Sequence, residues 1–230
     1  MISIRELDFH YEADSFSLKI PSLDVGAGER VACVGPSGSG KTTLLNLVAG
    51  ILATAKGKVE VCDVNLTGLG DSARRDFRIS SIGLVFQEFE LLDYLTVLDN
   101  VLLPFRINRS MQLTPEARET SRELLAQVGL ADVAHRRPDH LSHGQRQRVA
   151  VCRALSTMPK LVLADEPTAS LDEANKLRVL DMLDAHVQRA GATLIVVTHD
   201  DEVTRRFDRT INIASITSDT STVDVLSQVR

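Results

Sequence analysis

The clearest chemical signal in the sequence is a glycine-rich run at residues 35–42. It reads GPSGSGKT and fits the pattern G-x-x-x-x-G-K-[ST] at every required position. A strand-like run, RVACV, precedes it, and an apolar helical run, TTLLNLVAG, follows it, which is the context in which such a loop binds phosphate. The pattern predicts a nucleoside triphosphate site formed by these residues: Gly35, Pro36, Ser37, Gly38, Ser39, Gly40, Lys41, Thr42 and Thr43.

The residue types of this loop suit ATP with its magnesium ion. The glycines let the backbone N–H groups of residues 38–43 converge on phosphate oxygens, and the helix N-terminus adds a favourable field. We expect Lys41 to neutralise the β and γ oxygens and the Thr42 hydroxyl to bind Mg²⁺. The alternative is a glycine-rich turn that binds nothing.

Two adjacent carboxylates end the apolar run LVLADE at residues 161–166. A strand of this composition places Asp165 at the carboxyl edge of a sheet, where the Mg²⁺ of a nucleotide lies. We expect Asp165 to bind the metal and Glu166 to activate the attacking water. A polar strand end without a ligand is the alternative.

A further unusual run is LSHGQ at residues 141–145. Ser142 and Gln145 have the spacing of a capping box, which predicts that a helix begins here. Gly144 lies within the first turn, where glycine costs helix stability and a capping box has no use for it. The run therefore predicts a helix start whose glycine the capping box does not explain. The RQR that follows, residues 146–148, is expected to be a solvated helix face.

The totals describe an ordinary globular protein. The chain has 230 residues, 43% of them hydrophobic and 25% charged, which is enough to bury a full core. Its net charge of −5 argues against a main role in nucleic-acid binding, and no direct nucleic-acid partner is expected. No apolar run approaches the roughly 18 residues of a membrane span, and the first residues lack a signal-peptide pattern. The three cysteines are far apart and are expected to be buried apolar residues in a cytoplasmic protein.

Short apolar runs alternate with helical patterns toward both ends of the chain. Strands are expected at 2–9, 30–34, 58–61, 82–85, 161–164 and 193–197, and helices at 41–52, 115–128 and 173–189. The alternation predicts an α/β fold with a mainly parallel sheet. We expect one domain over 1–230, with an α/β core at 1–87 and 160–213, an inserted helical subdomain at 88–159 and a peripheral tail at 214–230.

Together these motifs resemble the nucleotide-binding subunits of ABC transporters, which are P-loop ATPases. The resemblance covers residues 1 to about 213 in the family's motif order, and LSHGQ resembles the family signature LSGGQ. It implies an antiparallel β portion near the N-terminus. It also implies the following further roles: Gln87 as the Q-loop residue at Mg²⁺ and the γ-phosphate, Asp172 in the D-loop, His199 as the switch histidine, and Tyr11 stacked on adenine.

The resemblance also implies partners. Two subunits would pack head to tail as a homodimer, and the signature residues Ser142, His143, Gly144 and Gln145 of each would meet the ATP of the other. Hydrolysis would then drive an integral-membrane permease on a separate chain, with the subunit peripheral on the inner face of the cell membrane. GLVFQEFELLDYLTVLDNVLLP and LADEPTASLD are similar to the ATPases of lipoprotein-releasing, macrolide-exporting and cell-division systems.

Several alternatives remain open at this point. His199, Gln87 and Tyr11 could be ordinary surface or packing residues. His143 stands where the family has glycine, and its imidazole either takes up a proton beside the partner's phosphate or points away from it. A soluble ABC ATPase acting on nucleic acid or ribosomes and a P-loop kinase of small molecules are the rival functions. A soluble ABC ATPase of this kind would carry an inserted coiled coil, a zinc module or a fused second half. A P-loop kinase would lack the LSHGQ signature.

Overall fold

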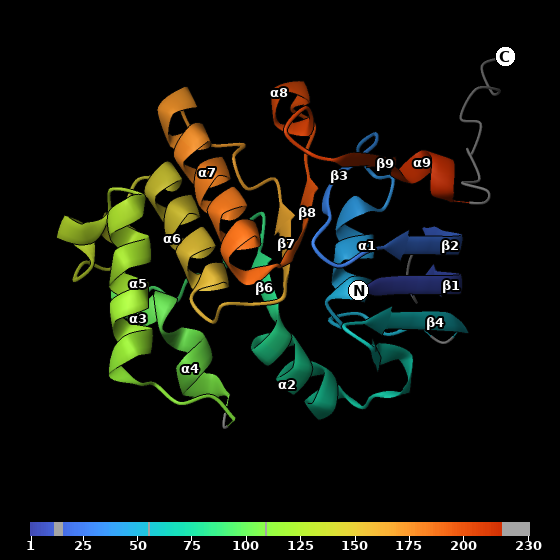
Figure 1. The fold of residues 1–230 in the computed structure, drawn as a ribbon, viewed down its shortest axis with the longest axis horizontal. Helices are drawn as coiled ribbons and strands as arrows, with labels where there is room; N and C mark the ends of the chain where they lie inside the picture. The colour runs from blue at the N-terminus through green and yellow to red at the C-terminus, as the bar shows by residue number, and fades with distance from the viewer. Residues whose placement is uncertain (12–15, 55, 109, 218–230) are drawn as a thin grey trace, which may run out of the picture.

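The computed structural model describes residues 1–11, 16–54, 56–108 and 110–217, and it contains two β-sheets with helices around them (Figure 1). One sheet has four strands in the order β2-β1-β4-β5, and its pairs are antiparallel. The other has five parallel strands in the order β6-β7-β8-β3-β9. The expected α/β fold with a parallel central sheet and an antiparallel N-terminal portion is confirmed.

The elements have these bounds. The strands are β1 (Ile2–His10), β2 (Ser17–Val25), β3 (Arg30–Val34), β4 (Lys56–Val61), β5 (Val64–Asn65), β6 (Ile82–Val85), β7 (Leu161–Asp165), β8 (Thr193–Val197) and β9 (Arg209–Asn212). The helices are α1 (Lys41–Val48), α2 (Asp71–Ser81), α3 (Val97–Val101), α4 (Leu103–Ile107), α5 (Pro115–Gln127), α6 (His143–Leu155), α7 (Glu173–Ala190), α8 (Asp201–Thr204) and α9 (Ile213–Ile216), with 3₁₀ turns at Leu66–Gly68, Ala131–Val133 and Pro138–His140.

The parallel sheet separates two hydrophobic cores, because successive side chains of a strand point to opposite faces. On β7, Leu161 and Leu163 pack into the core that contains α1 and the antiparallel sheet. Val162 and Ala164 pack into the other core, with α3, α5, α6 and α7. Figure 1 shows α1 between the two sheets and these four helices on the other side of the parallel sheet.

The helices α3, α4, α5 and α6 follow one another in the chain between β6 and β7. Thr114 caps α5 by accepting from the N–H of Ala117, with Pro115 in the first turn, as the sequence predicted. The division of the chain into a core and a helical subdomain stays a prediction. The expected tail at 214–230 falls mostly outside the described residues. Among those described, no helix combines the length and apolar character needed to cross a bilayer.

Three of the elements that were not expected from the sequence have a clear physical reason for being missed. Strand β2 contains Pro21, which argues against a strand, but β2 is an edge strand, where proline is tolerated. Strand β9 is also an edge strand, and only Ile211 of it is buried. Helix α2 buries none of its side chains and so has no apolar stripe to reveal it. The helix expected at 41–52 is shorter than predicted and ends at Val48.

The contact between β6 and α6 gives a stability prediction. A Cβ atom on Gly83 would overlap the carbonyl oxygen of Ala154 and lie 2.8 Å from Pro159 Cγ. Gly83→Ala should therefore lower the free energy of unfolding by about 1–3 kcal/mol, as overpacking does. Gly68→Ala is the control, because its Cβ would meet nothing closer than 4.0 Å. Denaturant unfolding measures both, and equal stability of the two variants would contradict the proposed close packing.

Candidate nucleotide-binding site

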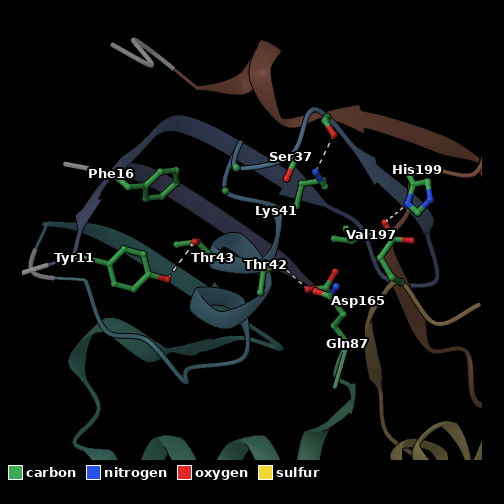
Figure 2. A pocket seen from close by; sticks show the side chains of 14 residues that line it. Tyr11, Phe16, Ser37, Lys41, Thr42, Thr43, Gln87, Asp165, Val197 and His199 are labelled. Carbon is green, nitrogen blue, oxygen red and sulfur yellow. Dashed lines mark hydrogen bonds and ion pairs between the residues drawn. The ribbon is translucent and has the colours of Figure 1, made fainter. Parts of the chain in front are cut away.

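A pocket of about 520 Å³ lies at the carboxyl ends of the parallel strands. Figure 2 shows Tyr11 and Phe16 at one end of it, and Asp165 and His199 toward the other. Of the loop residues expected to bind ATP, Pro36 and Ser39 are absent from its lining. The lining residues are Tyr11, Phe16, Gly35, Ser37, Gly38, Gly40, Lys41, Thr42, Thr43, Gln87, Asp165, Glu166, Val197 and His199.

The glycine-rich loop has the shape of a cradle for an anion. Gly38 has φ +76° and Gly40 φ +96°, a left-handed conformation that favours glycine, and a Cβ on Gly40 would lie 2.9 Å from Phe16. Lys41 Nζ folds back onto the loop and donates to the carbonyl oxygens of Gly35 and Pro36, each at 2.8 Å. The buried hydroxyl oxygen of Ser39 has no hydrogen-bond partner among the described residues. A phosphate group suits this loop.

Asp165 meets the start of α1 at the centre of the pocket. Thr42 Oγ1 donates to Asp165 Oδ2 over 2.6 Å, and Asp165 is buried. Burial raises the pKa of the Asp165 carboxyl, while the Thr42 hydrogen bond and the charge of Lys41 act in the opposite direction. A carboxylate whose charge is disfavoured by burial gains from a nearby cation, so the hydroxyl and carboxylate oxygens here fit Mg²⁺, a hard cation.

Glu166 lies next to Asp165 in a strained position. Its φ is +48°, which is uncommon for a residue other than glycine. Its carboxylate oxygen Oε1 is 2.6 Å from His199 Nδ1, and this contact raises the pKa of His199. Its backbone is held on both sides: the N–H donates to Val197 O, and the C=O accepts from Gln147 Nε2 at 2.9 Å. Glu166 and His199 thus contact each other and line the same pocket as the glycine-rich loop.

Gln147 and Arg148 correct the expectation of a solvated face at residues 146–148. Gln147 is 2% exposed and Arg148 is 9% exposed. Arg148 Nη1 donates to the carbonyl oxygen of Val128 and to Asn175 Oδ1, both at 2.7 Å. That prediction is wrong because each of these long polar side chains finds buried partners on neighbouring segments and does not extend into solvent.

Tyr11 and Phe16 form the aromatic end of the pocket. The Tyr11 hydroxyl is 3.3 Å from Thr43 Oγ1, and the ring centroids of Tyr11 and Phe16 are 6.1 Å apart. Phe16 was not predicted as a pocket residue, although it is a second aromatic residue close after FHY in the sequence. The stacking of Tyr11 on a base stays a prediction.

The LSHGQ run forms the start of α6, outside the phosphate pocket. The capping box is confirmed: Gln145 N–H donates to Ser142 Oγ at 3.3 Å, and Ser142 N–H donates to Gln145 Oε1 at 2.8 Å. Gly144 does not simply face outward, because a Cβ there would lie 3.2 Å from Leu171 and 3.4 Å from Ser170 O. Close packing against Ser170 and Leu171 is therefore one reason why position 144 holds a glycine.

His143 and Asp172 occupy the rim of this region. The imidazole of His143 packs edge-on against the buried ring of Phe89, with centroids 4.6 Å apart. A second pocket of about 450 Å³ includes His143 and shares Gln87 and Glu166 with the first. Asp172 is the N-cap of α7 and accepts from the N–H of Asn175 at 2.9 Å, a bond that lowers the pKa of Asp172.

Comparison with known proteins places the chain in a family. The model of the ABC transporter family matches residues 18–169. The lipoprotein-releasing system ATP-binding protein LolD of Anaeromyxobacter dehalogenans is 45% identical over 191 residues, covering 83% of this chain and 80% of LolD. LolD of Pseudomonas fluorescens is 40% identical over 216 residues, covering 93% and 94%. The chain belongs to the ABC transporter ATP-binding proteins, and it is an ATPase.

A solved structure supports the same fold. The ATP-binding cassette MJ0796, in a dimeric post-hydrolysis state bound to ADP and Pi, has a TM-score of 0.85 to this chain. It is 34% identical in sequence, and the match covers 92% of this chain and 94% of MJ0796. A second dimeric structure of MJ0796 matches equally well.

The contact between His199 and Glu166 predicts a shifted titration. The protonated imidazole should persist above the ordinary histidine range, and Glu166→Gln should lower the pKa of His199 because it removes the negative partner. The ion pair stabilises the folded state fully below the ordinary pKa, and this contribution is lost as pH rises through the raised pKa. Since His199 is 77% exposed, the effect on stability is small.

NMR titration of the His199 ring protons measures this shift. The resonance is assigned by its loss in His199→Gln. The same titration midpoint in the wild type and in Glu166→Gln would contradict the ion pair.

Proposed function

We propose that this subunit hydrolyses ATP in a nucleotide-sandwich homodimer and thereby drives a membrane permease carried on a separate chain. One observation carries the dimer. Lys41, Asp165, Glu166 and His199 line a single pocket, whereas Ser142, Gly144 and Gln145 at the start of α6 are not among its lining residues, and in this proposal they meet the nucleotide of a second chain. Dimeric structures of the related cassette MJ0796 support this proposal.

Each residue of the pocket has a role in this proposal. Lys41 leaves the carbonyl oxygens that it now contacts and binds the β and γ oxygens, while the N–H groups of the loop bind the same phosphates. Tyr11 and Phe16 contact the base. Glu166 accepts a proton from the attacking water, and His199 holds the Glu166 carboxylate in place through its 2.6 Å contact.

Thr42, Asp165 and Gln87 would hold Mg²⁺. When bound, the ion neutralises charge on the phosphate oxygens and orients the leaving group. Ser142 and Gly144 of the partner subunit donate to the γ-phosphate from the other side. The site is then complete only when the two subunits close on two ATP molecules.

A third pocket supports the permease as the partner. It measures about 200 Å³ and lies between α2, β6, α4 and α6, with Phe86 on its wall directly before Gln87. Its lining is mostly apolar, and Ile107 at its edge is 58% exposed. We propose that a helical segment of the permease docks here, so that Gln87 senses the γ-phosphate on one side and the permease on the other.

The relatives suggest the direction of transport. The two LolD proteins are ATP-binding proteins of lipoprotein-releasing systems. We extend this to the present chain as export or extraction of a lipid-linked cargo, with the subunit attached to the cytoplasmic face of the membrane through its permease.

Glu166→Gln tests the ATPase dimer. Removal of the general base should lower turnover by about 10²–10⁴-fold and leave ATP binding intact, so that a closed dimer accumulates. Size-exclusion chromatography with and without ATP measures the dimer. Glu166→Gln combined with Lys41→Ala is the matched control and should stay monomeric, because Lys41 contacts the phosphates in the ground state. A monomeric or fully active Glu166→Gln variant would refute the proposal.

Gln87→Ala tests coupling to the permease. The isolated subunit should retain measurable ATPase activity, whereas the complex reconstituted with its permease should lose transport. ATPase and transport are assayed in parallel, and Ile107→Ser serves as a second variant that disturbs only the docking groove. Equal losses in both assays for Gln87→Ala, or a subunit that does not co-purify with a membrane protein, would count against this partner.

A further inference from the structure

A buried glutamine connects α6 to the catalytic end of β7. Gln147 lies in the second turn of α6, three residues after Gly144, and is 2% exposed. Both polar atoms of its amide are used: Nε2 donates to the carbonyl oxygen of Glu166 at 2.9 Å, and Oε1 accepts from the N–H of Ser170 at 3.3 Å. A buried amide with both ends paired fixes the segments that it joins.

The bond to Glu166 acts on a strained residue. A left-handed φ of +48° is kept by a glutamate only where the surroundings hold it. Val197 O holds the N–H of Glu166 from β8, and Gln147 holds its C=O from α6. The orientation of this peptide decides where the Glu166 carboxylate points, so the position of α6 enters the geometry of the catalytic base.

The same end of α6 is expected to meet the partner's ATP. Ser142 is the N-cap of α6 and Gly144 is the second residue of the helix. Gly144 is packed against Ser170 and Leu171. Gln147 follows within one turn and binds the same Ser170. Helix α6 lies beside α7 in Figure 1. Gln147 thus joins the start of α6 to Ser170 and Glu166 through two hydrogen bonds.

We propose that Gln147 is a positioning residue that aligns Glu166 with the attacking water only when α6 is seated on the partner's ATP. The inference rests on the proposed nucleotide-sandwich dimer and deepens it, because it links each signature to the catalytic base of its own chain. Gln147 contacts no nucleotide in this scheme and acts through the Glu166 backbone.

Two substitutions separate the bonds of Gln147. Gln147→Met has a similar length and loses both hydrogen bonds. Gln147→Glu keeps an acceptor for Ser170 N–H but loses the donor to Glu166 O. Ser156→Ala is the matched control, because Ser156 is also buried on α6 and its hydroxyl bonds only to Arg153 O, within the same helix.

The measurements are kcat and KM for ATP hydrolysis, equilibrium ATP binding and thermal unfolding. Both Gln147 variants should lose about 10- to 100-fold in kcat, the range expected for a misplaced catalytic group, with ATP affinity changed less than about twofold. Their unfolding temperatures should fall, because each variant leaves a buried backbone group unpaired, but the loss of kcat should persist at temperatures where both variants are fully folded. A Gln147→Glu variant as active as the wild type, or losses of kcat that follow losses of stability, would overturn the inference.

A double mutant separates this inference from the proposed function. If Gln147 acts through Glu166, adding Gln147→Met to Glu166→Gln should lower the residual single-turnover rate no further. If the double mutant instead loses rate by the product of the two single losses, the role of Gln147 is overturned, and Glu166 remains the base. A Glu166→Gln variant that keeps full activity would instead refute the proposed function.

Discussion

The site depends on a carboxylate buried at the end of β7. Asp165 is 6% exposed, and an unpaired charge at such a position costs several kcal/mol. The structure offsets this cost with the Thr42 hydroxyl and the nearby charge of Lys41, both from the N-terminal turn of α1. That turn is placed by the loop after β3, and β8 lies between β3 and β7 in the sheet. The glycine-rich loop, the strand order and the carboxylate are thus parts of one electrostatic arrangement.

The sheet holds these groups because it is packed on both faces. Apolar residues alternate along β7 and β8 between two cores, so neither strand can shift by one residue without exchanging its faces. The strand ends are therefore fixed relative to one another, and loops at those ends can carry strained residues such as Glu166. The edges of the antiparallel sheet are β2 and β5, and those of the parallel sheet are β6 and β9.

Local patterns predicted the central parts of the fold and site, and long-range contacts account for what they missed. The phosphate loop, the strand that ends at Asp165 and the capping box at Ser142 each depend on residues close together in the sequence. The burial of Gln147 depends on Glu166, 19 residues away. The packing of His143 on Phe89 joins positions that are 54 residues apart in the sequence. No periodicity encodes such pairs. Phe16 differs, because its aromatic side chain close after FHY was apparent in the sequence, although its contact with the loop at Gly40 was not.

In the proposed dimer, Ser142 would serve both folding and binding. In the capping box its oxygen accepts from the N–H of Gln145, which uses a lone pair and leaves the hydroxyl hydrogen for another acceptor. An N-cap of this kind is worth about 1 kcal/mol, and a hydrogen bond to a charged oxygen about 1.5–3 kcal/mol. Because the two bonds use different parts of the hydroxyl, a phosphate oxygen from a partner can be bound without breaking the cap. The start of α6 is therefore already ordered before the subunits meet, and closure of the dimer does not have to include the entropy of forming this turn.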